Sequence, residues 1–157
     1  TVNGIIHRNL NSESIIISRD GLCYVVDFGV SKFMSEPIGR RGMTVTGAPL
    51  YMAPEMVRTD PPAYNEKVDI WSLGILGFEM GFGKAPLQVG YDEDPYATHI
   101  RQQLRTCEAP KFPRGAGGFS DNYAEFIDKM LVLNTVDRDS AVRLLQDEYM
   151  LAMVQRE

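Results

Sequence analysis

Apolar and polar positions divide the chain into a short β-rich start and a longer helical remainder. Residues 14–18 (SIIIS) and 22–26 (LCYVV) are two β-prone runs, and Arg19-Asp20-Gly21 separates them. An Asp-Gly pair between apolar runs indicates a tight turn between antiparallel strands. We therefore predict a β-hairpin over residues 14–26.

The remainder of the pattern is helical. Residues 65–80 are apolar on nearly every side, which is typical of a helix at the centre of a core. Gly81, Gly83 and Pro86 are expected to end that helix. Further helices are predicted over residues 95–104, 122–133 (with Ser120 or Asp121 as its N-cap) and 140–153.

One long stretch follows neither period. Residues 28–62 are rich in Gly, Pro, Ser and Thr, and we predict a loop there. Loops longer than about 15 residues within a compact domain are usually functional or disordered.

Composition and charge narrow the class of protein. A chain of 157 residues with 44% hydrophobic and 24% charged residues is typical of one globular domain or part of a larger one. A net charge of −5 argues against a nucleic-acid partner, and no apolar run is long enough for a membrane helix. The first residues, TVNGIIHRN, do not have the pattern of a signal peptide.

The two cysteines, Cys23 and Cys107, are too few for a disulfide framework and have no metal-ligand spacing. We therefore expect a reducing, intracellular location, the cytoplasm, and no membrane partner. Cys23 lies in the second β-prone run and is expected to be a small buried side chain.

Four short motifs occur in a fixed order along the chain. They are HRNLNSES at residues 7–14, DFG at 27–29, APE at 53–55 and DIWSLG at 69–74. In this order and spacing they resemble the C-terminal lobe of a eukaryotic protein kinase. The resemblance covers the whole chain, residues 1–157, and implies an α+β fold: a mainly α-helical lobe with a short β-hairpin. GAPLYMAPE, DIWSLGI and DFGVSK favour the sterile-type group of serine/threonine kinases.

The resemblance also implies parts that this chain does not contain. The Gly-rich loop, the strand lysine and its glutamate partner belong to an N-terminal lobe, so residues 1–157 are expected to be a partial kinase domain, from catalytic loop to final helix. The helix that normally packs against the helix of Trp71 would also be missing. An exposed apolar face is therefore expected unless another segment or chain covers it.

The resemblance places four substitutions in the catalytic region. Asn9 stands at the position of the catalytic-base aspartate, and Asn11 at that of the lysine that neutralises the transferring phosphate. Ser14 takes the place of the asparagine that binds the second magnesium, and Ala48 that of a threonine that bonds the aspartate and lysine. Loss of a positioned base typically costs about 10²–10⁴ in rate.

Other residues match the kinase pattern. Asp27 corresponds to the acid that binds magnesium on the nucleotide, so Mg-ATP is a possible cofactor, with Ser14 as a weak second ligand. A retained structural acid at the end of the hairpin is an equally good reading of Asp27. Glu55 and Arg138 correspond to a buried ion pair, and Asp69 to the residue that holds the catalytic-loop backbone.

His7 and Arg8 complete the retained frame. By the resemblance, His7 braces the loop rather than carrying a proton, and Arg8 reads a phosphorylated activation loop whose candidate acceptors are Thr44 and Thr46.

Three hypotheses remain open. The first is a catalytically impaired pseudokinase that acts as scaffold or allosteric partner of other proteins, such as an active kinase, in a signalling complex. The alternative is a divergent but active serine/threonine kinase that uses ATP, with Asn9 only orienting the substrate hydroxyl and Asp27 holding the metal. In the third, this portion of a kinase does not fold alone.

Overall fold

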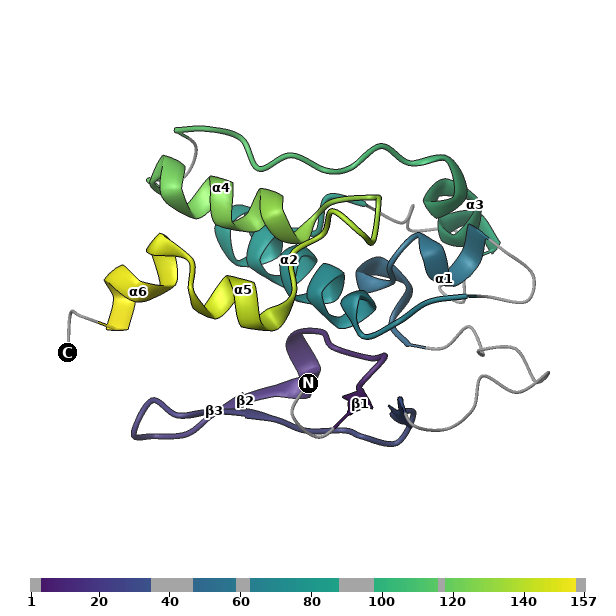
Figure 1. The fold of residues 1–157 in the computed structure, drawn as a ribbon, viewed down its shortest axis with the longest axis horizontal. Helices are drawn as coiled ribbons and strands as arrows, with labels where there is room; N and C mark the ends of the chain where they lie inside the picture. The colour runs from purple at the N-terminus through teal and green to yellow at the C-terminus, as the bar shows by residue number, and fades with distance from the viewer. Residues whose placement is uncertain (1–3, 35–46, 59–62, 88–97, 116–117, 155–157) are drawn as a thin grey trace.

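The computed structural model describes residues 4–34, 47–58, 63–87, 98–115 and 118–154 (Figure 1). The β-strands are β1 (Ile5–Ile6), β2 (Ile15–Ile17), β3 (Cys23–Val25) and β4 (Lys32–Phe33). The helices are the 3₁₀ turns η1 (Ser12–Ser14) and η2 (Pro49–Tyr51), then α1 (Glu55–Arg58), α2 (Lys67–Phe82), α3 (Thr98–Thr106), α4 (Asp121–Met130), α5 (Ala141–Leu145) and α6 (Glu148–Val154). Within the described ranges the fold is therefore mainly helical with small sheets.

The predicted hairpin is present. β2 and β3 pair antiparallel, with Ile15 opposite Val25 and Ile17 opposite Cys23. A second small sheet joins β1 to β4, with Ile5 opposite Phe33. The sequence did not predict this sheet, because strands of two residues are too short to show an alternating pattern.

Cys23 is exposed, so the prediction that it is buried was wrong. Figure 1 shows the hairpin lying along one edge of the helical body, with its turn projecting away from it. Every residue of β3 is exposed for that reason, including Tyr24 and Val25.

α2 is the central helix, as its apolar composition predicted. Trp71 and Ile75 are fully buried, and Val68 is only 1% exposed. The helix ends at Gly83, whose φ of 73° lies in the left-handed region that glycine adopts without strain. Gly81, which was also expected to end the helix, lies within it.

α4 packs directly on α2 because α2 presents glycines to it. A Cβ at Gly74 would lie 2.9 Å from Cβ of Met130, and one at Gly77 would lie 2.4 Å from Cδ1 of Ile127. α4 begins after Ser120, whose side-chain oxygen accepts a hydrogen bond from the backbone N–H of Tyr123. Ser120 rather than Asp121 is therefore the N-cap.

The single helix predicted over residues 140–153 was wrong, since two helices, α5 and α6, occupy this region. The break follows from Asp147, whose side chain accepts a hydrogen bond from the backbone N–H of Tyr149 at 2.9 Å. An aspartate at such a position caps a new helix, and it competes with continuation of the old one.

The predicted loop over residues 28–62 contains β4, η2 and α1, so it is more ordered than expected in its described parts. Residues 35–46 and 59–62 lie outside the described residues. α3 runs from Thr98 to Thr106, close to the predicted 95–104.

An apolar groove of about 410 Å³ lies between α2, α4, α5 and α6. Leu73, Met80, Phe126 and Leu145 are among its lining residues. This groove matches the exposed apolar face that was expected. Within the described ranges, no helix is long and apolar enough to span a membrane.

Candidate active site

The loop from His7 to Ser14 is held from below by α2. Asp69 accepts hydrogen bonds from the backbone N–H groups of His7 at 2.7 Å and Arg8 at 2.9 Å. Arg8 has a φ of 67°, a conformation that needs such support in a residue other than glycine. Burial raises the pKa of Asp69 above its ordinary value, although these hydrogen bonds act in the opposite direction.

His7 is buried and has a partner on each ring nitrogen. Its Nε2 lies 2.8 Å from the carbonyl oxygen of Val26, and Nδ1 accepts from the backbone N–H of Asn9 at 3.3 Å. A carbonyl only accepts and an N–H only donates, so Nε2 donates to Val26 and Nδ1 accepts from Asn9. The ring also packs edge-on against Phe28, with centroids 4.8 Å apart. The arrangement suits a residue that braces the loop.

Asn9, at the expected position of the catalytic base, is bonded on both sides of its amide. Its Oδ1 accepts from the backbone N–H of Ala48 at 2.8 Å, and its Nδ2 donates to Oδ2 of Asp27 at 3.0 Å. A neutral amide cannot take a proton from a hydroxyl at neutral pH. The group at this position can therefore orient a neighbour but cannot act as a base.

Asn11 is buried and its side chain serves the loop itself. Its Nδ2 donates to the backbone oxygen of Asn9 at 2.8 Å, and its Oδ1 accepts from the backbone N–H of Glu13 at 2.8 Å. The side chain carries no charge and does not supply a cation at the position where a phosphate-binding lysine is expected.

Ser14 is 1% exposed, and its hydroxyl is bonded twice to the backbone of Asn11, as acceptor from N–H and as donor to C=O, both at 2.9 Å. Together with Asn11 it forms a capping box at the start of η1. A hydroxyl with these partners is poorly placed to ligate a metal, so the predicted role of Ser14 as a ligand gains no support from its geometry.

Asp27 is exposed, with a φ of 63° at the end of the hairpin. Magnesium bound with a nucleotide commonly uses one or two carboxylates, and phosphates and waters complete its shell. Asp27 fits that requirement as a single ligand. In the part of the chain that the structure describes, no group of three or more His, Cys, Asp or Glu side chains could hold a metal ion.

Ala48 lies beside the loop without the hydroxyl expected there, and its backbone N–H makes the contact with Asn9 instead. The preceding Gly47 has a φ of 104°, and a Cβ there would lie 2.3 Å from the backbone oxygen of Arg8. Only glycine permits this close approach of the two segments.

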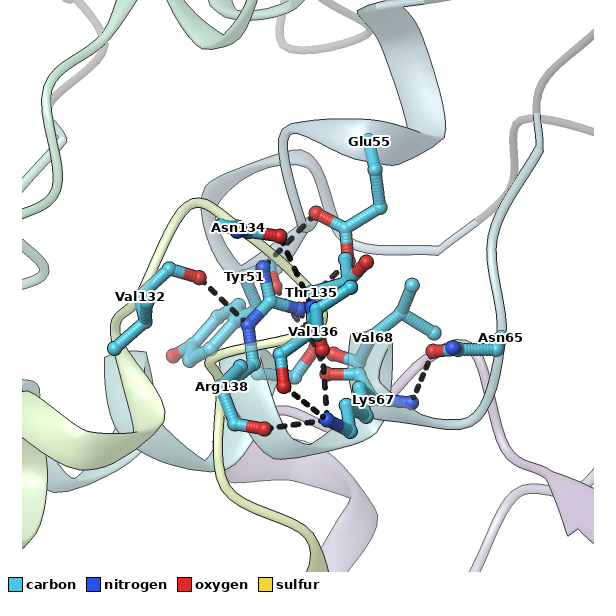
Figure 2. A network of polar contacts seen from close by, with 11 residues as sticks. Tyr51, Glu55, Asn65, Lys67, Val68, Val132, Asn134, Thr135, Val136 and Arg138 are labelled. Atoms are coloured by element: carbon cyan, nitrogen blue, oxygen red, sulfur yellow. Dashed lines mark hydrogen bonds and ion pairs between the residues drawn. The ribbon is translucent and has the colours of Figure 1, made fainter.

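Glu55 and Arg138 form the buried pair that was expected, and Figure 2 shows the network around them. Nη1 and Nη2 of Arg138 contact the two carboxylate oxygens of Glu55 at 2.6 and 3.0 Å, and Arg138 is fully buried. Nε of Arg138 donates to the carbonyl of Val132, and its guanidinium lies 5.0 Å from the centre of the Trp71 ring.

Lys67 completes this network, a role that the sequence did not suggest. Its Nζ donates to the carbonyl oxygens of Thr135 at 2.7 Å and Arg138 at 2.6 Å (Figure 2). The pair and Lys67 together fasten α1 and α2 to the segment before α5.

The sequence profile of the protein kinase domain matches residues 2–150. The chain belongs to the protein kinase family. It is 37% identical over 144 residues to Sporulation-specific protein 1 of Saccharomyces cerevisiae, and the matched region covers 92% of this chain and 27% of the relative. It is 33% identical over 147 residues to Serine/threonine-protein kinase PAK mbt of Drosophila melanogaster, and the matched region covers 94% of this chain and 22% of the relative. The same identity and length hold for Serine/threonine-protein kinase PAK 4 of Homo sapiens, with 94% and 23% covered.

The kinase resemblance of the motifs is thereby established as family membership, and the α+β fold as that of a protein kinase domain. The chain spans about a quarter of the length of these relatives. The activity, substrates and partners of the whole protein are therefore matters for proposal.

The structure brings part of this kinase site together. Asn9, Asn11, Asp27 and Ala48 share one hydrogen-bonded network, and Asn11 links it to Ser14. Glu55 and Arg138 form a separate structural network.

The side chain of Arg8 makes two hydrogen bonds within the described residues. Its Nε donates to the carbonyl of Val30 at 2.6 Å and Nη1 to the hydroxyl of Tyr64 at 3.3 Å. The candidate acceptors Thr44 and Thr46 lie outside the described residues, so the expected role of Arg8 stays a prediction.

Tyr51 is a site residue that sequence reasoning missed. Its hydroxyl donates to the carboxylate of Glu79 on α2 and lies 3.1 Å from Oγ of Ser12. Burial raises the pKa of this phenol, and the bond to Glu79 acts in the same direction. Ser12, Tyr51 and Glu79 are far apart in sequence and share no motif, so only the fold could reveal the connection.

Proposed function

We propose that this kinase domain is a catalytically impaired, pseudokinase-like domain that acts as a scaffold or allosteric partner of other signalling proteins. The observation that carries the proposal is Asn9, an amide at the position of the base, bonded on both sides to Ala48 and Asp27. The motifs DFGVSK, GAPLYMAPE and DIWSLGI support a place in the sterile-type group of serine/threonine kinases.

The chemistry of phosphoryl transfer explains why these substitutions matter together. The reaction depends on alignment and on neutralising negative charge more than on covalent steps by the protein. Asn9 supplies no base, and Asn11 supplies no cation beside it. A missing base alone costs about 10²–10⁴ in rate. The effects of such a cluster are not additive, because its members act as a unit.

When bound, ATP would supply the phosphoryl group, and magnesium would supply positive charge that offsets the negative charge of the phosphates. Asp27 is the residue that would hold it, and the N-terminal lobe expected in a longer protein would supply most of the nucleotide contacts. We propose that residues 1–157 are the part of that domain from the catalytic loop to its final helix.

The test of this proposal is phosphate transfer by the full-length protein, to itself and to generic basic substrates, with magnesium-ATP. We expect no transfer above that of the Asp27→Ala variant. Turnover comparable to an ordinary kinase, abolished by Asp27→Ala, would overturn the proposal.

A divergent, active serine/threonine kinase is the second candidate, and the exposed carboxylate of Asp27 beside Asn9 favours it. In that enzyme Asn9 orients the substrate hydroxyl and Asp27 is the single protein ligand of the metal. Asn9→Asp should then raise the rate and Asn9→Ala should lower it. Unchanged rates in both variants would count against this candidate.

A separate experiment tests whether residues 1–157 fold on their own. Circular dichroism and a thermal melt of the isolated chain are the measurements, and a sharp cooperative transition would exclude the possibility that it does not fold alone.

A further inference from the structure

The amide of Asn9 joins three segments of the chain. Besides its bonds to Ala48 and Asp27, Oδ1 lies 3.3 Å from Nδ2 of Asn11. The segments are the catalytic loop, the end of the hairpin after β3, and the start of η2. At Gly47 the last of these lies directly against the loop, with no room for a Cβ.

The orientation of the amide is fixed by its partners. The backbone N–H of Ala48 can only donate, so Oδ1 must face it, and the carboxylate of Asp27 accepts, so Nδ2 must face Asp27. An aspartate at position 9 would turn one carboxylate oxygen toward Asp27, and like charges at hydrogen-bond distance repel. The repulsion would turn the side chain away from Asp27, and its bond to the backbone N–H of Ala48 would be lost as well.

We propose that Asn9 is a positioning residue, a clasp that holds Asp27 and the Gly47–Ala48 segment against the catalytic loop. The clasp requires an amide at position 9 or at position 27. Asn9 cannot act as a base, but it adds a hydrogen bond to Asp27 that an aspartate at this position could not donate. The clasp does not depend on the proposed function.

The proposal predicts a specific coupling between two substitutions. Asn9→Asp alone places two carboxylates in contact and breaks the clasp. Asp27→Asn alone keeps an acceptor oxygen for the amide of Asn9, so the clasp holds. In the double variant Asn9→Asp/Asp27→Asn the donor and acceptor are exchanged, and the new amide at position 27 donates to the new carboxylate at position 9.

The test is hydrogen exchange of the Ala48 backbone amide by NMR in the full-length protein, normalised to the amide of Ile75 in the core. Asn9→Asp should lower the protection of Ala48 about tenfold, the effect expected when the hydrogen bond from its backbone N–H to position 9 is lost. Asp27→Asn and the double variant should leave it within about twofold of the unchanged protein. Asn122→Asp, the same change in charge on the exposed start of α4, is the control and should have no effect.

The clasp is overturned if the Ala48 amide is unprotected in the unchanged protein, if Asn9→Asp leaves its protection unaltered, or if Asn9→Asp lowers it equally with and without Asp27→Asn. None of these results depends on phosphate transfer. An active enzyme with an intact clasp would overturn the proposed function alone, and an inactive protein without this coupling would overturn the clasp alone.

Discussion

The side-chain amide of Asn9 accepts a hydrogen bond from Ala48 and donates one to Asp27. By comparison with the kinase motif, an amide at this position is a missing base. In the fold the same amide gains contacts with Asp27 and Ala48 that a carboxylate could not make together. A motif identifies the position, but the partners 18 and 39 residues away become visible only in three dimensions.

Asp69 should make stability depend on pH in an unusual direction. Burial raises its pKa above 3.8, so the folded protein binds this proton at a higher pH than the unfolded chain does. The contribution of this carboxyl is therefore fully present below pH 3.8 and declines as pH rises through the folded-state pKa. The comparison is with Asp69→Asn, which has no proton to bind.

The measurement is the free energy of urea unfolding for both proteins at a series of pH values from 3.8 upward. The stability of the unchanged protein relative to Asp69→Asn should fall as pH rises in that range. A relative stability that rises with pH would show that the two backbone hydrogen bonds outweigh burial.

At the scale of elements, Glu55 and Arg138 tie α1 to the segment that precedes α5. Glu55→Ala should cost about 3–5 kcal/mol of unfolding free energy, because it leaves a fully buried guanidinium without its carboxylate partner. Asp139→Ala is the matched control, since it removes an ion pair at 3.5 Å with the exposed Arg143 and should cost at most about 1 kcal/mol. Chemical denaturation measures both, and equal losses would contradict the structural role of the buried pair.

The contact between α2 and α4 makes a second prediction at this scale. Gly74→Ala should destabilise the protein by about 1–3 kcal/mol although alanine favours helix, because its Cβ would lie 2.9 Å from the Cβ of Met130, close to the α4 backbone. Gly77→Ala should cost less, since its Cβ would clash with Cδ1 of Ile127 at 2.4 Å, the end of a side chain that can move, and would lie at an ordinary contact distance of 3.4 Å from the hydroxyl of Tyr123. Thermal melts of both variants provide the comparison, and the reverse order would contradict this packing.

The sequence predicted most of the helices and the hairpin, but it did not predict where a helix breaks or which short strands pair. The apolar pattern predicted α2 and the β2–β3 hairpin because both are long or regular enough to show a period. It missed the break between α5 and α6, which depends on the single cap Asp147, and the pairing of β1 with β4, which depends on the fold. The candidate site residues were predicted from their positions in the motifs. The roles of Lys67 and Tyr51 are visible only in the fold, because their partners are distant in sequence.

For the whole molecule, the described residues form a helical body around α2 with the catalytic loop at its edge (Figure 1). Two interactions expected of a kinase scaffold are present. Asp69 accepts hydrogen bonds from the backbone of the catalytic loop, and Glu55 forms an ion pair with Arg138. Asn9 and Asn11 stand where the kinase motif leads us to expect groups that act on substrate. We therefore propose that the molecule keeps the frame of a kinase site while the chemistry of that site is changed.

We propose that this site does not transfer phosphate at the rate of an ordinary kinase. The most direct measurement is the mass of the full-length protein and of a generic basic substrate after prolonged incubation with magnesium-ATP, beside the Asp27→Ala variant purified in the same way. We predict equal, background levels of added phosphate in both preparations. Phosphate that accumulates at an ordinary kinase rate in the unchanged protein, and is absent with Asp27→Ala, would show instead that the domain is an active kinase.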